Sequence, residues 1–293
     1  MNVFGYPLPV ILGQLMLGLV NGSFYALLSL GLAVIFGLLG VVNFAHGAFY
    51  MLGAYAAWFA LDSFGINYWL ALILAPLAVG LLGIVIERLF LRHLYRLDPL
   101  YGLLLTFGIA LIAEGVLRYR FGSSGQSYPV PSQLAGAVNL GFMVLPIYRG
   151  WVIGASLVVC FTTWFVIERT RLGATLRAAT ENARLVQAFG INVPLMVMLT
   201  YGGGVALAAL AGVLSAPVIQ VNPLMGSSLV IVVFAVVVIG GMGSILGTIV
   251  SGLVLGLIEG LTKVIYPEAS NIVVFVIMAI VLIWRPAGLF GKE

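Results

Sequence analysis

Two carboxylates, Glu114 and Glu259, are the only ones well inside long apolar segments of this 293-residue chain. Each is followed four residues later by a basic residue, Arg118 or Lys263, so that both charges lie on one face of a helix. The acidic residue comes first, which is the more favourable order for such a pair. A lone charge at the centre of a bilayer costs at least about 2.5–3.5 kcal/mol. We favour structural ion pairs near the outer ends of their helices, where the basic side chain reaches the membrane surface. The alternative is a proton relay in a proton-coupled secondary carrier that uses Glu114 or Glu259.

A second polar group is formed by Asn43 and His46, which lie three residues apart at the mouth of an apolar run. They can line a pathway or gate, or they can cap the helix and bond to a neighbouring backbone. We favour the structural role, because an inward-facing position is expected in either case. Only His93 accompanies His46 as a second histidine, and Cys160 is the single cysteine, so the sequence predicts no metal site and no disulfide.

Glycine provides a third pattern, with 37 residues in the chain. Gly252, Gly256 and Gly260 stand four residues apart, a small-residue face that lets two helices approach closely. We interpret this face as tight packing within one bundle, which is compatible with a sliding surface or a subunit interface. The sequence contains no phosphate-binding Gly-x-x-x-x-Gly-Lys-[Ser/Thr] loop, no paired catalytic carboxylates and no convincing nucleophile–base set. We therefore expect no catalytic residues.

The elements that hold these residues must lie in a membrane. Hydrophobic residues make up 62% of the chain and charged residues 8%, against roughly 25% charged in a soluble domain. The apolar runs are about twenty residues long and apolar on every face, whereas barrel strands alternate apolar and polar residues. The net charge of +4 comes from short clusters between apolar runs, which does not suggest nucleic-acid binding. The predicted fold is all-α, a polytopic transmembrane helix bundle surrounded by lipid.

We place the membrane spans near residues 9–38, 43–61, 68–90, 100–119, 148–167, 196–217, 225–242, 245–265 and 271–286. The first segment is too long for one upright crossing, because thirty helical residues extend about 45 Å. We expect it to break or tilt around residues 21–23, where Gly and Ser weaken a helix. The count is therefore eight to ten, with nine preferred.

The orientation follows from the basic residues in short loops. Nine spans put three basic clusters on one side, which is then cytoplasmic, with the N-terminus outside and the C-terminus cytoplasmic. The clusters are Arg88, Arg92 and Arg96; Arg169, Arg171, Arg177 and Arg184; and Arg285 and Lys292. The outer loop 120–147 is too short for a folded domain and is expected to pack as a cap. We treat residues 1–293 as a single transmembrane domain.

The longest polar stretch, residues 169–195, is not built like a linker. Apolar residues at four-residue spacing predict two short helices on the cytoplasmic face; the pairs are Leu172–Leu176 and Leu185–Phe189. Asn182 can cap a short helix and Gly190 can end it. An interfacial helix that rests on lipid headgroups through Arg177 and Arg184 and a loop that docks a partner are equally supported by the residues alone.

Four groups of motifs follow one another along most of the chain. They are Asn43-Phe44-Ala45-His46-Gly47 with Met51-Leu52-Gly53-Ala54-Tyr55; Arg171-Leu172-Gly173 with Arg177-Ala178-Ala179 and Gly190-Ile191-Asn192-Val193; Gly240-Gly241-Met242-Gly243-Ser244; and Arg285-Pro286-Ala287-Gly288-Leu289-Phe290-Gly291. Together they resemble the motifs of LivH-type permeases of branched-chain amino-acid ABC importers. The resemblance runs from the second predicted span to the C-terminus.

The resemblance implies a permease subunit of an ATP-driven importer in a bacterial-type cytoplasmic (inner) membrane, translocating branched-chain or similar small neutral amino acids. It implies a second related permease, two cytoplasmic ABC ATPases and an extracytoplasmic substrate-binding protein as partners. ATP hydrolysis would be supplied by the separate ATPases, so this chain is expected to be no enzyme and to need no cofactor of its own.

The resemblance also implies that segment 169–195 is the cytoplasmic coupling loop that docks into a groove on the ATPase, with a helix over residues 179–189. Its candidate coupling residues are Arg177, Ala179, Glu181, Asn182, Ala183, Arg184, Phe189 and Gly190. Many importers have Glu where this chain has Arg177 and Gly where it has Ala183, and the amino-acid branch commonly deviates in this way.

Overall fold

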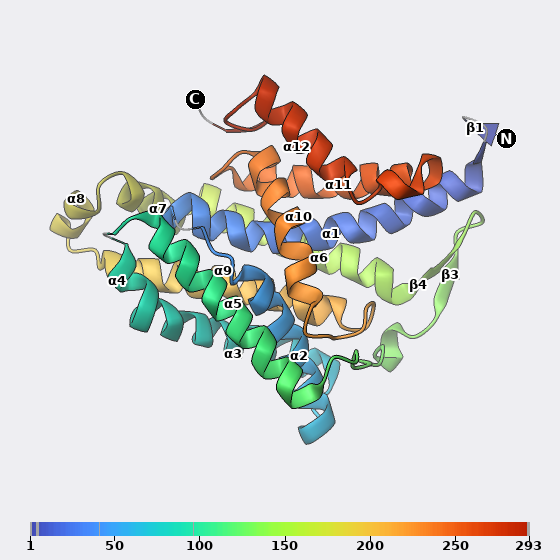
Figure 1. Ribbon diagram of the computed structural model, residues 1–293, viewed down its shortest axis with the longest axis horizontal. Coiled ribbons are helices and arrows are strands. Elements are labelled where there is room, and N and C mark those ends of the chain that lie inside the picture. The colour runs from blue at the N-terminus through green and yellow to red at the C-terminus, as the bar shows by residue number, and fades with distance from the viewer. Residues whose placement is uncertain (1, 4–5, 41, 96, 292–293) are drawn as a thin grey trace.

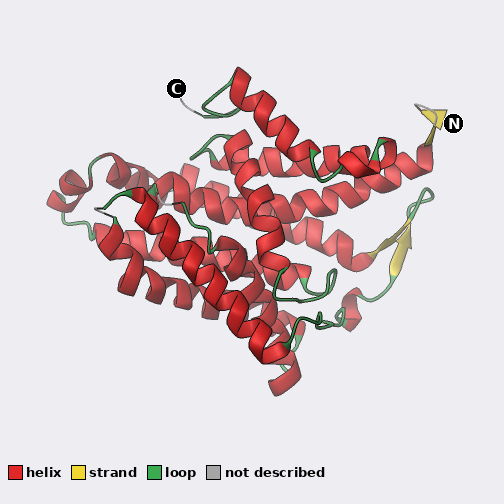
Figure 2. Ribbon diagram, in the orientation of Figure 1, coloured by secondary structure: helices red, strands yellow, loops and turns green. Residues whose placement is uncertain are grey.

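The computed structural model describes residues 2–3, 6–40, 42–95 and 97–291, and helices make up most of them (Figures 1 and 2). The longer helices are α1 (Leu8–Leu39), α2 (His46–Phe64), α3 (Tyr68–Ile86), α5 (Pro99–Phe121), α6 (Ile147–Arg169), α7 (Arg171–Glu181), α9 (Val193–Ser215), α10 (Met225–Gly240), α11 (Ile245–Ile265) and α12 (Val273–Trp284). Shorter helical pieces are a π-helical turn at Glu87–Leu91, α4 (Arg92–Leu94), α8 (Ala183–Ala188), and 3₁₀ turns at Ser132–Leu134 and Pro267–Ala269.

Two short hairpins depart from a purely helical fold. Strands β1 (Asn2–Val3) and β2 (Tyr6–Pro7) form one antiparallel pair, and β3 (Ala137–Asn139) and β4 (Val144–Pro146) form the other. Both pairs lie outside the helices, where a chain reversal leaves backbone groups that only a ladder or water can satisfy.

Each predicted span contains one helix, but not all of these helices are long and apolar enough to cross a membrane. Among the described residues, six are long and apolar enough: those that begin at Leu8, Tyr68, Pro99, Ile147, Val193 and Ile245. Helices α10 and α12 are apolar but have only 16 and 12 residues, about 24 and 18 Å against a hydrocarbon core of about 30 Å. The fold is thus a polytopic membrane bundle in which six of the described helices are long and apolar enough for a full crossing.

Helix α1 runs through the middle of the bundle without interruption (Figure 1), so a break at residues 21–23 is wrong, and the alternative, a tilted helix, stays a prediction. It packs along α11 and also contacts α9. Gly22 lies against α11, where an added Cβ would be 3.0 Å from Leu253 Cα. The close interhelical contact compensates for the roughly 1 kcal/mol that glycine costs within a helix.

The two ends of the bundle are built differently (Figure 1). One end carries α4, α7 and α8, and we call it the α7–α8 end; the other carries β3, β4 and the N-terminal residues and is the hairpin end. At the hairpin end, residues 120–147 pack onto the bundle. Gln126 and Val221 exchange backbone hydrogen bonds of 2.7 and 2.9 Å, and the Tyr128 side chain is buried. This loop therefore caps one end of the helices.

Candidate functional site

The polar segment between α6 and α9 forms two helices, α7 and α8, as the apolar spacing predicts. The single helix expected over residues 179–189 is wrong, because the chain breaks at Asn182. The Asn182 side-chain oxygen accepts a 3.0 Å hydrogen bond from the Leu185 nitrogen and so caps α8. Gly190, with φ of +80°, ends the segment in the left-handed region that glycine tolerates.

Helix α7 is fixed to the end of α6. The Arg177 guanidinium donates to the Ile167 carbonyl at 2.7 Å and pairs with Glu168 at 3.4 Å. Gly173 faces the same carbonyl so closely that no side chain could fit between them. Arg177, one of the predicted coupling residues, is therefore engaged within the chain and holds α7 in place.

In contrast, the predicted coupling residues on α8 and beside it are exposed. Asn182, Ala183, Arg184 and Gly190 lie at the surface. Among the apolar residues, Val186 is buried, whereas Leu185 is 56% and Phe189 is 77% exposed. Leu185 on α8 and Phe189 directly after it are thus two large apolar side chains at the surface.

Three of the sequence motifs, those in α7, in the α10–α11 loop and in the C-terminal loop (residues 285–291), line one cleft of about 490 Å³ at the α7–α8 end. Helix α7 supplies one wall, the α10–α11 loop and the C-terminal loop supply another, and α1 and α6 complete it. The lining residues are Ala33, Gly37, Ile167, Glu168, Arg177, Thr180, Glu181, Met242, Gly243, Ser244, Ile245, Phe290 and Gly291. The sequence motifs did not reveal this cleft.

The C-terminal loop, residues 285–291, is hydrogen-bonded to the end of α10 and packs against the loop that follows it. The backbone nitrogens of Leu289 and Phe290 donate to the carbonyls of Ile239 and Gly240, at 2.9 and 3.2 Å. Gly288 and Gly241, both with positive φ, lie in direct contact. Small residues with left-handed backbone are required here because two turns pack against each other.

Asn43 and His46 are fully buried at the start of α2. Asn43 donates to the Tyr201 hydroxyl at 3.2 Å, and its oxygen accepts from the Ala45 nitrogen at 3.1 Å. His46 Nε2 is 2.8 Å from the Leu28 carbonyl of α1. His46 thus bonds to a neighbouring backbone, as expected of a structural role, whereas neither side chain caps α2.

The glycine face of α11 packs against α1 of the same chain. A Cβ on Gly252 would lie 2.6 Å from the Ala26 nitrogen, and Gly256 and Gly260 lie against Gly22, Gly18 and Gln14. All three α11 glycines are buried, so this face is occupied within the subunit.

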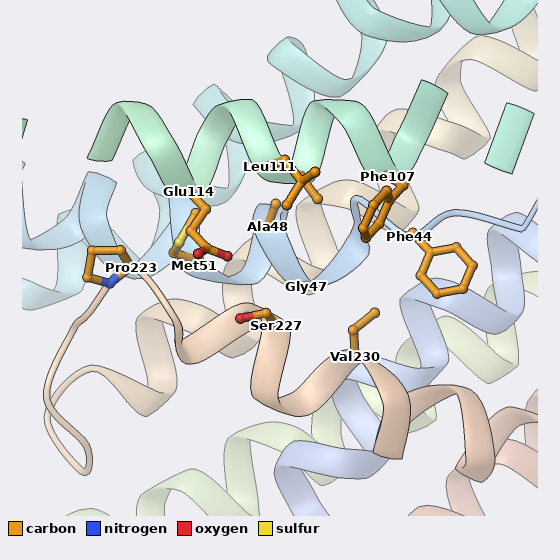
Figure 3. A pocket seen from close by; sticks show the side chains of 12 residues that line it. Phe44, Gly47, Ala48, Met51, Phe107, Leu111, Glu114, Pro223, Ser227 and Val230 are labelled. Carbon is orange, nitrogen blue, oxygen red and sulfur yellow. The ribbon is translucent and has the colours of Figure 1, made fainter. Parts of the chain in front are cut away.

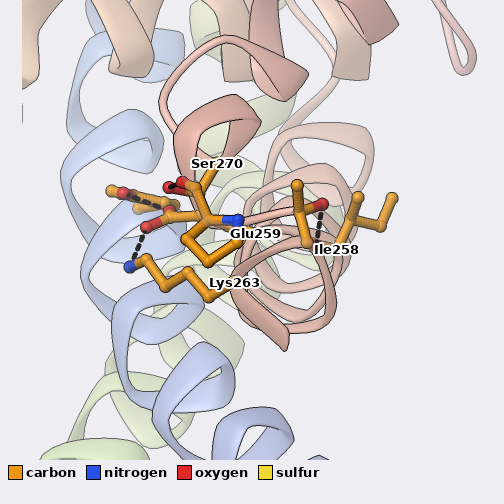
Figure 4. Close-up of polar contacts among 7 residues, drawn as sticks. Ile258, Glu259, Lys263 and Ser270 are labelled. Atoms are coloured by element: carbon orange, nitrogen blue, oxygen red, sulfur yellow. Dashed lines mark hydrogen bonds and ion pairs between the residues drawn. The ribbon is translucent and has the colours of Figure 1, made fainter. Parts of the chain in front are cut away.

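Both predicted ion pairs are present. Glu114 and Arg118 are 2.7 Å apart on α5, and Glu259 and Lys263 are 2.5 Å apart on α11. Figure 4 shows the dashed contact between Glu259 and Lys263. The other oxygen of Glu259 accepts a 2.7 Å hydrogen bond from the hydroxyl of Tyr25 on α1. The spacing predicted each pair but could not predict Tyr25, because that contact depends on how α1 and α11 pack.

A further carboxylate that was not expected from the sequence is Glu87, which is buried and only 2% exposed. It begins the π-helical turn after α3 and accepts a 3.1 Å hydrogen bond from the Tyr95 hydroxyl. Its position inside the predicted span 68–90 was the available signal. A π-turn widens the helix locally and is frequently found at functional positions.

Comparison with known proteins identifies the family. Residues 14–282 match the family model described as the permease component of branched-chain amino acid transport systems. The chain is 31% identical to the permease protein BraD of Pseudomonas aeruginosa and 30% identical to LivH of Salmonella typhimurium, over 96% of this chain and 96% of each relative. It is also 26% identical to LivM of Salmonella typhimurium, over 90% of this chain and 67% of that protein. No solved structure gives a significant match.

The family match confirms the resemblance drawn from the four motif groups, three of which line or border the cleft at the α7–α8 end. It also accounts for a chain with six helices that are long and apolar enough to cross a membrane and a polar segment at one end of the bundle. This chain therefore belongs to the family of permease components of branched-chain amino-acid transport systems.

Proposed function

We propose that this chain is a permease subunit of an ATP-driven ABC importer that moves branched-chain or similar small neutral amino acids into the cell. The observation that carries the proposal is full-length similarity to BraD and LivH, each described as a high-affinity branched-chain amino acid transport permease. The match gives no comparable support to a proton-coupled carrier.

The proposal includes nine crossings, with the N-terminus outside and the C-terminus in the cytoplasm. Figure 1 supports this arrangement, because α4, α7 and α8 lie at the same end of the bundle. Helix α4 contains Arg92 of the first basic cluster, and α7 and α8 contain residues of the second. Arg285 of the third cluster begins the C-terminal loop, which lines the cleft together with α7, and Lys292 lies outside the described residues. Lys and Arg accumulate on the cytoplasmic side of a membrane.

In this proposal, α8 is the part that meets an ATPase. Its exposed Leu185 and Phe189 fit an apolar groove, and Arg177 transmits movement because it ties α7 to the end of α6. The cleft between α7 and the α10–α11 loop gives the segment space to move. Closure of two ATPases on ATP would then tilt the bundle.

The partners belong to the proposal too. Similarity to both LivH and LivM proteins supports a pair of related permeases, one of which is this chain. Two ATPases would supply the energy and a binding protein would deliver the amino acid, so the permease itself would need no cofactor.

The experiment that tests the proposal is purification of the tagged chain from mild detergent, followed by mass spectrometry and by uptake of labelled leucine into proteoliposomes. We expect a second permease and two ATPases in comparable amounts, and leucine uptake that requires ATP. A chain that purifies alone, or uptake that an uncoupler abolishes and ATP does not affect, contradicts the proposal.

A further inference from the structure

A cleft between α2, α5 and α10 combines a carboxylate oxygen that has no partner among the described residues with an apolar wall. Figure 3 shows Glu114 of α5 and Ser227 of α10 near one end of this cleft, and Phe44, Phe107 and Val230 near the other. The remaining lining is apolar or glycine. The cleft therefore has a polar end and an apolar end.

Both polar groups at the polar end are hydrogen-bond acceptors. Glu114 uses Oε1 to bind Arg118 at 2.7 Å, and its Oε2 has no partner among the described residues. The Ser227 hydroxyl donates its proton to the Leu224 carbonyl at 3.0 Å, which leaves its oxygen lone pairs available. Two acceptors, one of them charged, match a cationic group such as an ammonium and not a carboxylate.

The apolar end is lined mainly by rings and branched side chains. Phe44 stacks on Phe234 with ring centroids 4.9 Å apart and meets Phe107 edge-on at 6.4 Å. Leu111 and Val230 complete this surface. Such a surface binds an aliphatic side chain by excluding water.

The position of Glu114 along α5 favours a role in a solute pathway over contact with lipid. Glu114 is fifteen residues after Pro99, about 22 Å from the start and about 12 Å from the end of a helix that is long and apolar enough to cross a membrane. Helix α5 is also the least buried of the six candidate spans, because only 11% of its most apolar stretch is buried by other parts of the chain. A charged pair on such an exposed helix is costly in lipid and usually marks a solute pathway.

Two helices that line the cleft, α2 and α10, are in contact through glycines. Gly47 of α2 and Gly226 of α10 both line it, and their backbones are in direct contact. With no side chains between them, α2 and α10 can shift relative to each other without unlocking packed groups.

We propose that this cleft is part of the translocation pathway and that Glu114 binds the α-ammonium group of a transported amino acid, while Phe44, Phe107, Leu111 and Val230 receive its apolar side chain. This inference rests on the proposed function and adds the place and chemistry of substrate contact. Arg118 holds the carboxylate in position and does not itself touch the substrate.

The first test uses the complete importer in proteoliposomes and compares two variants. Glu114→Gln keeps the shape of the cleft but removes its charge, so leucine uptake should fall about tenfold or more, the usual effect of losing a charge-assisted hydrogen bond. Arg118→Gln keeps the carboxylate and should reduce uptake less than threefold. Equal losses in the two variants would mean that only the ion pair matters, and would overturn the proposal.

The second test needs no transport. A thiol introduced by Ser227→Cys, in a Cys160→Ser background, is reacted with a cationic and an anionic thiosulfonate in nanodiscs. We expect the cationic reagent to react at least fivefold faster after normalisation to a free thiol, leucine to slow it, and Glu114→Gln to abolish the preference. Val158→Cys, on an exposed part of α6, is the lipid-facing control and should react with neither reagent.

An unreactive thiol at position 227, or one without charge preference, overturns the inference even if the importer works. A chain that binds no ATPases refutes the proposed function, and the labelling result still decides whether the cleft is a water-filled cation site.

Discussion

The Tyr25 hydroxyl on α1 donates a 2.7 Å hydrogen bond to Glu259 on α11, a residue 234 positions later in the chain. Lys263 binds the other oxygen of the same carboxylate, whose side chain is only 8% exposed. Both oxygens of a carboxylate inside the membrane are thus occupied, which favours a structural ion pair over a proton relay at this position.

Tyr25→Phe tests this relationship. Removing one hydrogen bond to a buried charge should lower the free energy of unfolding by about 1.5–3 kcal/mol, because the carboxylate keeps only Lys263 as a partner. Thermal unfolding in detergent measures the effect, and Tyr119→Phe on α5, where the side chain is 94% exposed, is the matched control. Unchanged stability in Tyr25→Phe, or equal losses in both, contradicts the prediction.

Gly256→Leu tests the packing of α11 on α1. The new side chain would overlap the Gly22 backbone, so the helices must separate, at a cost of about 1–3 kcal/mol or more. Gly154→Leu on α6 is the control, since nothing lies within 4 Å of an added Cβ there. The yield of folded protein and the midpoint of thermal unfolding should fall only for Gly256→Leu; similar values for the two variants would show that the α1–α11 contact is not tight.

Phe189→Asp tests the role of α8. Phe189 is 77% exposed, so the change should shift stability by no more than about 0.5 kcal/mol. It should nevertheless remove most of the ATPase that co-purifies, because a charge replaces the apolar contact. Gln187→Asp, also exposed on α8, should retain the ATPase. Full retention in Phe189→Asp shows that α8 is not the docking element.

Tyr128 in the capping loop provides a pH test. Burial, together with nearby Tyr68, raises the pKa of Tyr128 to about 12. Between about pH 10 and pH 12 the unfolded chain ionises this phenol while the folded chain keeps it neutral, so the free energy of unfolding falls as pH rises. Tyr128→Phe should reduce that fall.

The same variant should not lower stability at pH 8, since the Tyr128 hydroxyl has no hydrogen-bond partner among the described residues. Unfolding midpoints measured from pH 8 to 11.5 check both statements. Parallel curves for wild type and Tyr128→Phe would assign the alkaline loss to other groups.

The sequence by itself determined the features that depend on neighbours along the chain. Apolar length predicts the long helices, and four-residue spacing predicts the Glu114–Arg118 and Glu259–Lys263 pairs. Local side-chain chemistry predicts the cap at Asn182 and the left-handed Gly190. The motifs were sufficient to indicate the family.

Only the tertiary structure decided which helix faces meet. Local propensity predicts a weak point at Gly22, yet α1 continues because α11 packs on that glycine. The convergence of α7, the α10–α11 loop and the C-terminal loop on one cleft, and the burial of Glu87, likewise depend on contacts between distant segments. In a membrane every span is apolar on all sides, so hydrophobic periodicity carries little information about which face turns inward; close packing of small residues and a few polar contacts determine it instead.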